Sequence, residues 1–215
     1  MNHIRSTAIV AKTILEQNPL FLDTETTGWG SRAQIVEIAV LDMDGNALID
    51  TLVRATCPIG VGAARVHGIV PDMLTDAPTF DQILDKLSEI LHDRTCVIYN
   101  LEFDHRLMWQ SGLAHGVQEL PFENVDFKCA MLLYAEFWRE KHDYNEFRWQ
   151  KLGSEARQQK IVLPKDLHRA RADAELTDHF LFRLMLSPEN HRARADAELT
   201  RRLMIKMSEA SNGQV

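Results

Sequence analysis

Two periodicities run through the chain, one typical of strands and one typical of helices. Short apolar runs bounded by turn residues predict five strands, which lie in PLFLDTETTG, IVEIAVLDM, ALIDTLVRA, TCVIYN and NVDFKC. The turn sequence Asp44-Gly45-Asn46 predicts that the second and third strands pair as an antiparallel hairpin. The predicted sheet therefore opens with an antiparallel meander.

Apolar residues at helical spacing predict helices before, between and after these strands. They are expected at 6–17, 79–92, 102–113, in AMLLYAEFW, at about 148–159 and at 168–186. Strands that alternate with helices predict an α/β fold, in which helices flank one mixed five-stranded sheet. The expected domains are an N-terminal helix (1–18), the α/β domain (19–186) and an appended C-terminal helix (187–215).

The ten residues HRARADAELT occur twice, beginning at His168 and again at His191. The apolar pattern continues beyond the identity in both copies, so both are predicted to be amphipathic helices that arose by duplication of about one helix. Either copy is a candidate for the same groove, within one chain or across a homodimer, because exchange of identical elements is a low-cost route to dimers.

Acidic residues follow the predicted strands and open the last helix of the domain. Asp23 and Glu25 are two apart on one strand and therefore share a face. Asp104 follows the fourth strand, and Asp173 lies five residues after His168. Each residue alone is more often a helix cap or a solvated charge. Gathered at one edge, four carboxylates would repel one another unless divalent cations such as Mg²⁺ lay among them.

Three motifs in order make the pattern specific: D-x-E-T-T-G, N-x-x-F-D and H-x-x-x-x-D. FLDTETTG, YNLEFD and HRARADA resemble the three motifs of the DEDDh 3′–5′ exonucleases, the group that contains RNase T and the proofreading subunit of bacterial DNA polymerase III. AARVHGIVPDML resembles the segment that this family packs near the terminal nucleotide. The resemblance covers residues 19–186 and implies a ribonuclease H-like fold.

The resemblance also implies a reaction, the hydrolysis of the 3′-terminal phosphodiester of mainly single-stranded DNA or RNA to release nucleoside 5′-monophosphates. Asp23, Glu25, Asp104 and Asp173 would hold two ions, Mg²⁺ or Mn²⁺. His168 would be the general base that takes a proton from the attacking water, a role that suits imidazole near neutral pH.

The resemblance places a further set of residues at the terminal nucleotide: Thr26, Thr27, Gly28, Trp29, His67 and Asn100. Trp29 stands where the family often has leucine, and its indole either stacks on a base or packs against its own chain. His67 either touches the nucleotide or is a buried, hydrogen-bonded histidine. Glu37, on the second strand, is either a carboxylate that supports the site or an edge charge, and the edge charge is the simpler interpretation.

Sequence context favours the first copy of the repeat as the catalytic one. His168 and Asp173 follow a predicted helix and a loop, as in the family, whereas only SPEN separates His191 and Asp196 from a helix that should already cover the sheet. The second copy is then a surface helix whose arginines extend a phosphate-binding face or are merely solvated.

Composition sets the remaining alternatives. The formal net charge of −7 argues mildly against nucleic acid, but the C-terminal third is rich in arginine and lysine. The fold could therefore also serve as a catalytically silent nucleic-acid-binding module, or as a hydrolase of small phosphodiesters. Three widely spaced cysteines and the lack of a signal peptide or membrane span indicate a cytoplasmic protein with no membrane partner.

Overall fold

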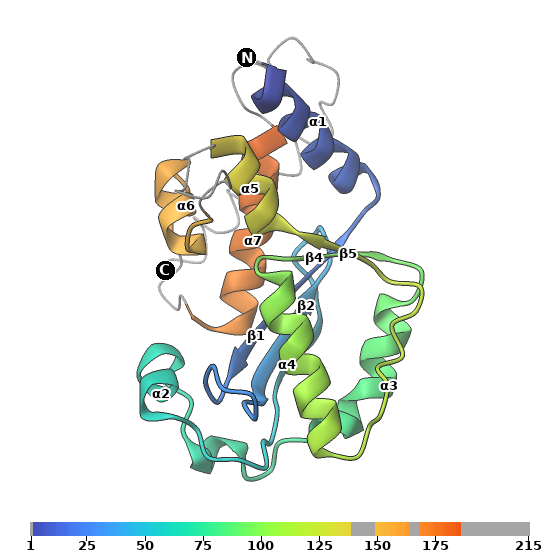
Figure 1. Ribbon diagram of the computed structural model, residues 1–215, viewed down its shortest axis with the longest axis vertical. Helices are drawn as coiled ribbons and strands as arrows, with labels where there is room; N and C mark the ends of the chain where they lie inside the picture. Colours follow the sequence, from blue (N-terminus) through green and yellow to red (C-terminus); the bar gives the residue numbers. More distant parts are fainter. Residues whose placement is uncertain (1, 139–148, 164–167, 186–215) are drawn as a thin grey trace.

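One five-stranded sheet organises the residues that the computed structural model describes, which are 2–138, 149–163 and 168–185 (Figure 1). Its strands run in the order β3-β2-β1-β4-β5. Strand β2 is antiparallel to β1 and β3, whereas β4 is parallel to β1 and to β5. The predicted mixed sheet and its opening meander are confirmed. The strands are β1 (Leu20–Thr26), β2 (Ile35–Leu41), β3 (Ala47–Leu52), β4 (Thr95–Ile98) and β5 (Asp126–Cys129).

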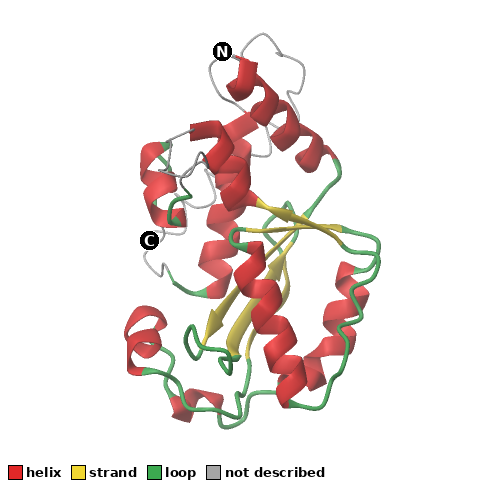
Figure 2. Ribbon diagram, viewed as in Figure 1, coloured by secondary structure: helices red, strands yellow, loops and turns green. Residues whose placement is uncertain are grey.

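Alternate side chains of the strands supply two separate hydrophobic cores, one on each face of the sheet. Phe21 and Val97 point to a core formed with four helices, whereas Leu22 and Ile98 point to a core formed with two. The first group is α1 (Asn2–Glu16), α5 (Ala130–Trp138), α6 (Leu152–Gln158) and α7 (Ala170–Met185). The second is α3 (Phe80–Leu91) and α4 (Leu101–Ala114). Figure 2 shows these helices around the strands.

Helix α7 is the element that carries residues to the middle of the sheet. It lies against β1 and β2, and α1 and α5 pack on it in turn. Ala11, Ile14 and Leu15 of α1 are buried in the same core as Phe180 of α7. The N-terminal helix thus shares a core with the rest of the fold.

Two short elements between β3 and α3 escaped the sequence prediction. Helix α2 (Val61–His67) and the 3-10 helix η1 (Pro71–Leu74) lie in the segment that contains AARVHGIVPDML. Only His67 of α2 is buried, so its sequence carries no apolar stripe. The helix ends at Gly68, whose φ of 73° is left-handed and whose N–H bonds to the Ala64 carbonyl.

The helices of the last third start later than their patterns suggested. Helix α6 begins at Leu152 and α7 at Ala170, two residues beyond His168. His168 itself has a φ of 71°, which no helical residue has. The appended helix predicted at 187–215, with His191 and Asp196, lies outside the described residues. None of the described helices has the length and apolar character needed to cross a bilayer.

Phe180 offers a test of the core beneath α7. Its side chain is fully buried, and its ring centroid lies 4.9 Å from that of Tyr134 and 6.2 Å from that of Tyr99. We expect Phe180→Ala to lower the free energy of unfolding by about 3–5 kcal/mol, measured by urea denaturation, because the lost contacts leave a cavity. Leu132→Ala on α5, where the side chain is 61% exposed, should change it by less than about 0.5 kcal/mol. Equal effects of the two changes would contradict this assignment of the core.

Candidate active site

The site begins at the carboxyl end of β1, where polar residues replace apolar ones. Because side chains alternate along a strand, Asp23 and Glu25 lie on the face covered by α7, as Phe21 does, and Thr24 lies on the face covered by α4. Asp23 and Glu25 are both partly buried. The predicted sharing of one face by these two carboxylates is confirmed.

Asp104 reaches the same place from the first turn of α4. Strand β4 is parallel to β1, so α4 starts beside the end of β1. The side chain is 3% exposed, and the Thr24 hydroxyl donates a hydrogen bond of 2.7 Å to its Oδ1. Thr24 occupies the variable position of D-x-E, and nothing in the motif indicated that its hydroxyl orients the carboxylate of another motif.

Residues at the start of α7 complete the group. The backbone N–H of His168 donates to Oδ1 of Asp173 at 3.2 Å, and His168 Nδ1 lies 3.9 Å from Asp173 Oδ2. Glu25, His168 and Asp173 can each present one ligand atom so that all three atoms lie within 4.8 Å of one another. The structure therefore brings the first copy of the repeat together with β1.

Electrostatics at this site oppose four simultaneous negative charges. Burial, followed by the charge of Asp173, raises the pKa of Glu25 to about 9. Burial raises the pKa of Asp104 to about 7, although its hydrogen bond from Thr24 acts in the opposite direction. Burial and then Asp104 raise the pKa of Asp23 well above its usual range. Cations among these oxygens would relieve the conflict, so the residues fit a site for hard divalent ions.

The turn after β1 is held by its own hydrogen bonds. The Thr27 N–H donates to the Gln34 carbonyl at 2.8 Å, and the Gln34 N–H donates to the Thr27 hydroxyl at 3.0 Å. The Thr26 hydroxyl donates to the Gly28 carbonyl at 3.0 Å. Gly28 has a φ of 150°, which a residue with a side chain rarely adopts. The turn that the resemblance places at the terminal nucleotide is thus held by three hydrogen bonds of its own.

His67 is buried, and both of its ring nitrogens have protein partners. The Ile69 N–H donates to Nδ1 at 3.0 Å, so Nε2 carries the hydrogen and donates to the Thr26 carbonyl at 3.1 Å. Burial lowers the pKa of this imidazole. The geometry matches the interpretation of a hydrogen-bonded histidine, which here ties α2 to the end of β1.

Trp29 follows this turn directly and is exposed, whereas Asn100 follows β4 and is half-buried. The Trp29 side chain is 79% exposed, and its ring centroid lies 4.8 Å from that of Phe103. Arg106 places its guanidinium carbon 5.3 Å from the centre of the Phe103 ring. Asn100 precedes α4, and its side chain makes no capping hydrogen bond. Trp29 therefore packs on α4 and still presents most of its surface.

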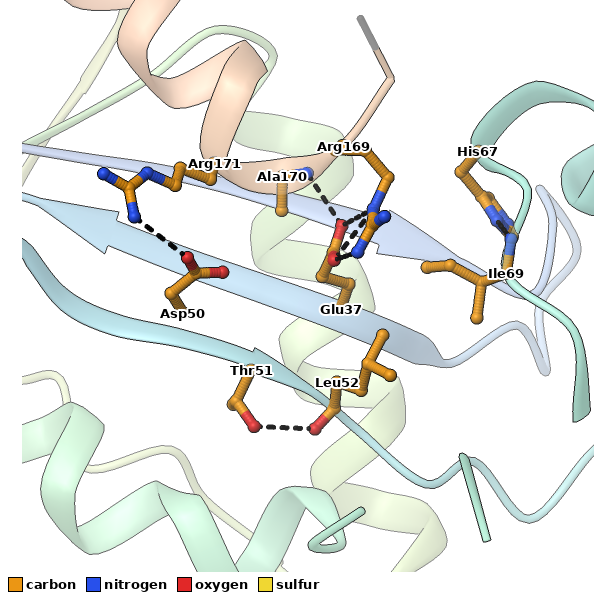
Figure 3. A network of polar contacts seen from close by, with 9 residues as sticks. All are labelled: Glu37, Asp50, Thr51, Leu52, His67, Ile69, Arg169, Ala170 and Arg171. Atoms are coloured by element: carbon orange, nitrogen blue, oxygen red, sulfur yellow. Dashed lines mark hydrogen bonds and ion pairs between the residues drawn. The ribbon is translucent and has the colours of Figure 1, made fainter. Parts of the chain in front are cut away.

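Glu37 is a buried carboxylate on a central strand, which excludes the interpretation of an edge charge. Its side chain accepts hydrogen bonds from the Arg169 guanidinium and from the Ala170 N–H, whereas Arg171 pairs with Asp50 on β3 (Figure 3). Arg169 and Arg171 are thus paired with carboxylates. At these two positions, the positive charges of the C-terminal third are balanced by the carboxylates of Glu37 and Asp50.

A family model described as exonuclease matches residues 20–181. The chain belongs to this exonuclease family. An uncharacterized exonuclease of Escherichia phage 186 is 37% identical over 170 residues, which span 78% of this chain and 88% of that protein. The PolC-type DNA polymerase III of Bacillus cereus is 27% identical over 179 residues, 81% of this chain but 12% of that protein. The recognised resemblance is confirmed.

Solved exonucleases share the fold. Exonuclease X, solved with 5′ overhanging duplex DNA, is 25% identical with a TM-score of 0.58 and coverage of 79% of this chain and 92% of that one. The nuclease domain of 3′hExo, a DEDDh family member bound to rAMP, has a TM-score of 0.62 at 14% identity, with coverage of 81% and 94%. The ribonuclease H-like fold expected from the three motifs is confirmed.

The raised carboxyl pKa values predict how the metal-free exonuclease responds to pH. An unfolded glutamate loses its proton near pH 4.5, whereas folded Glu25 keeps it up to about pH 9. Between these values the folded state binds more protons than the unfolded state, so stability falls as pH rises. We expect the thermal unfolding midpoint in EDTA to be several degrees lower at pH 8 than at pH 6.

Two comparisons isolate the site in that experiment. Excess Mg²⁺ at pH 8 should raise the midpoint, because an ion that binds only the folded state stabilises it. Glu25→Gln should show a smaller loss between the two pH values, since glutamine cannot titrate. A midpoint that increases from pH 6 to pH 8 in EDTA would contradict the assignment of these carboxyls.

Proposed function

We propose that this exonuclease is a metal-dependent enzyme that degrades nucleic acid from the 3′ end and releases nucleoside 5′-monophosphates. The observation that carries the proposal is the meeting of one ligand atom each of Glu25, His168 and Asp173 within 4.8 Å. The partly buried Asp23 and the buried Asp104 lie beside them, since their charges act on one another. Three segments distant in sequence supply these groups. An ordinary surface cluster of acids would not bury its members against one another.

Two ions, Mg²⁺ or Mn²⁺, are proposed to be held by Asp23, Glu25, Asp104 and Asp173. The raised pKa values support this choice, because the carboxyls can be fully ionised only with cations among them. When bound, such a pair stabilises the charge that develops on the attacking and leaving oxygens of a phosphodiester. The structure of Pop2p from S. pombe, which has the same fold at 12% identity, is described as a form bound to Mg²⁺ and Mn²⁺.

His168 is proposed as the general base. Its side chain is 52% exposed, so a water molecule and a substrate phosphate can reach it, and its backbone is fixed by the hydrogen bond to Asp173. The imidazole would accept the proton of the attacking water as the water oxygen bonds to phosphorus and the 3′ oxygen of the preceding nucleotide leaves.

The proposed substrate is the single-stranded 3′ end of DNA or RNA. Thr26, Thr27 and Gly28 would support the terminal sugar. The Asn100 side chain makes no hydrogen bond that caps α4, and it is proposed to contact the nucleotide as well. His67 would act by holding the Thr26 carbonyl. Relatives act on or bind different polymers: exonuclease X was solved with duplex DNA, and another neighbour recognises a histone mRNA stem-loop. A cytoplasmic location, where thiols stay reduced, fits the three free cysteines.

The second copy of the repeat is proposed to be an appended helix outside the catalytic groove. The contacts of the first ten residues cannot separate the copies, because these residues are identical. The continuation can, since Asp178 and Met185 are buried against the fold whereas the second copy has Arg201 and Ser208 at these positions. Exchange of the copies across a homodimer remains the alternative, and light scattering of the full chain tests it.

The first experiment uses 5′-labelled single-stranded DNA and RNA with Mg²⁺, Mn²⁺ or EDTA. We expect a metal-dependent ladder shortened from the 3′ end for the wild type and for His191→Ala. The rate should fall by about 10²–10⁴-fold in His168→Ala, the usual contribution of a general base. A ladder lost only in His191→Ala would assign catalysis to the second copy. No ladder from any protein would favour the silent binding module.

Trp29 gives a separate test of substrate binding. We expect Trp29→Ala to raise KM for a single-stranded oligonucleotide by about fivefold or more, because base stacking contributes about 1–3 kcal/mol. The matched control is Trp149→Ala, since this tryptophan is 62% exposed and lies outside the site segments. If Trp29→Ala lowered only the unfolding midpoint and left KM unchanged, the indole would serve solely to pack on Phe103.

A further inference from the structure

We propose that Glu37 is a positioning residue that fixes His168 and Asp173 through the first residues of α7, and that Arg169 is its partner in this role. We call the contacts of Glu37 with Arg169 and Ala170 the Glu37 clamp. The proposal rests on the proposed function, because it concerns the general base and a metal ligand of that reaction. Neither Glu37 nor Arg169 is one of the four carboxylates or the histidine of the family pattern.

The position of Glu37 on the sheet explains why it can act on the site. It lies directly across from Glu25 in the antiparallel pairing of β1 and β2, so it projects to the face covered by α7. Glu37 is only 3% exposed. A carboxylate buried beside four others is costly unless it is well paired, and its negative charge adds to the forces that raise the pKa of Glu25.

The clamp satisfies this carboxylate completely from one segment. Arg169 Nε lies 2.9 Å from Oε1 and 3.0 Å from Oε2, and Arg169 Nη2 also donates to Oε1. The Ala170 N–H donates to Oε2 at 2.9 Å. A planar guanidinium that pairs with both carboxylate oxygens fixes orientation as well as distance. Figure 3 shows Arg169 and Ala170 beside Glu37. These two residues directly follow His168 in the sequence.

His168 needs such support because of its backbone conformation. Its φ of 71° places it in the left-handed region, which costs a residue with a side chain free energy and persists only where neighbours determine it. This turn directs the His168 N–H to Asp173 Oδ1 and brings Nδ1 toward Oδ2. Without the clamp, residues 168–170 would relax toward a regular helical start, and both side chains would shift.

A second ion pair between α7 and the sheet supplies a matched control. Arg171 Nη1 lies 3.3 Å from Asp50 Oδ2, and both side chains are more than one-third exposed. This pair joins the same helix to the neighbouring strand, but it does not hold the residues next to His168 (Figure 3). Asp50→Asn therefore removes a contact of the same kind without releasing the clamp.

The test compares Glu37→Gln with Asp50→Asn in the full chain. Glutamine keeps the size of the side chain but cannot accept from Arg169 and Ala170 with both of its terminal atoms. At saturating Mn²⁺ we expect Glu37→Gln to lower kcat at least tenfold with KM changed less than threefold. Asp50→Asn should retain the wild-type kcat. Arg169→Gln should reproduce the loss, whereas Arg192→Gln, at the identical position of the second copy, should not.

Two further measurements separate positioning from general support. At saturating Mn²⁺ in a His168→Ala background, Glu37→Gln should lower the residual kcat less than twofold, because the general base that it positions is gone and its effect through Asp173 is on the affinity for Mn²⁺. Free Mn²⁺ measured by electron paramagnetic resonance should show binding at least fivefold weaker in Glu37→Gln than in wild type and Asp50→Asn. This binding test needs no turnover, so it remains decisive for the clamp even if the wild type releases no nucleotide and the proposed function fails.

Three results would overturn the proposal. Wild-type kcat and Mn²⁺ affinity in Glu37→Gln would show that the clamp positions nothing. Equal losses of kcat in the wild-type and His168→Ala backgrounds would show that Glu37 supports the fold in general. Equal effects of Glu37→Gln and Asp50→Asn on Mn²⁺ binding would show that any ion pair beneath α7 serves as well.

Discussion

Carboxyls removed from water meet at the end of β1, and the cost of their burial, together with their mutual repulsion, is the constraint that the surrounding structure has to satisfy. Burial and then the charge of Asp173 raise the pKa of Glu25 to about 9, and burial also raises the pKa values of its neighbours Asp23 and Asp104. Such a group lowers the stability of the metal-free fold at neutral pH, because charges are removed from water without partners. Divalent cations held among the same oxygens, as proposed above, would offset this cost.

Neighbouring residues hold this unstable group in place from three directions. Thr24 orients Asp104 from the α4 face, and Glu37 holds the start of α7 from the opposite face. His67 ties α2 to the carbonyl of Thr26, at the point where β1 turns away. None of the three side chains is a member of the D-E-D-D-H set. The geometry of that set therefore depends on hydrogen bonds made by residues outside it.

The sequence predicted most of this fold because strands and long helices carry strong periodic signals. It placed all five strands, and it gathered Asp23, Glu25 and Asp104 by strand alternation and element order. It missed α2, whose only buried residue is His67, because a helix that rests on one side chain shows no period. It also could not reveal Thr24 or the pairing of Glu37 with Arg169, which joins residues 132 positions apart.

The duplicated segment shows where local sequence loses its power to specify structure. Arg169, Arg171 and Asp173 make polar contacts at the start of α7. The second copy has the same residue at each of the equivalent positions. The Glu37 clamp would therefore accept either copy. What distinguishes them lies further along α7, where Met185 is buried in a core also lined by α1 and α5 and the second copy has Ser208 at the same position. We therefore infer that the proposed choice of His168 over His191 rests on the residues that follow the repeat, because the repeated residues themselves are identical.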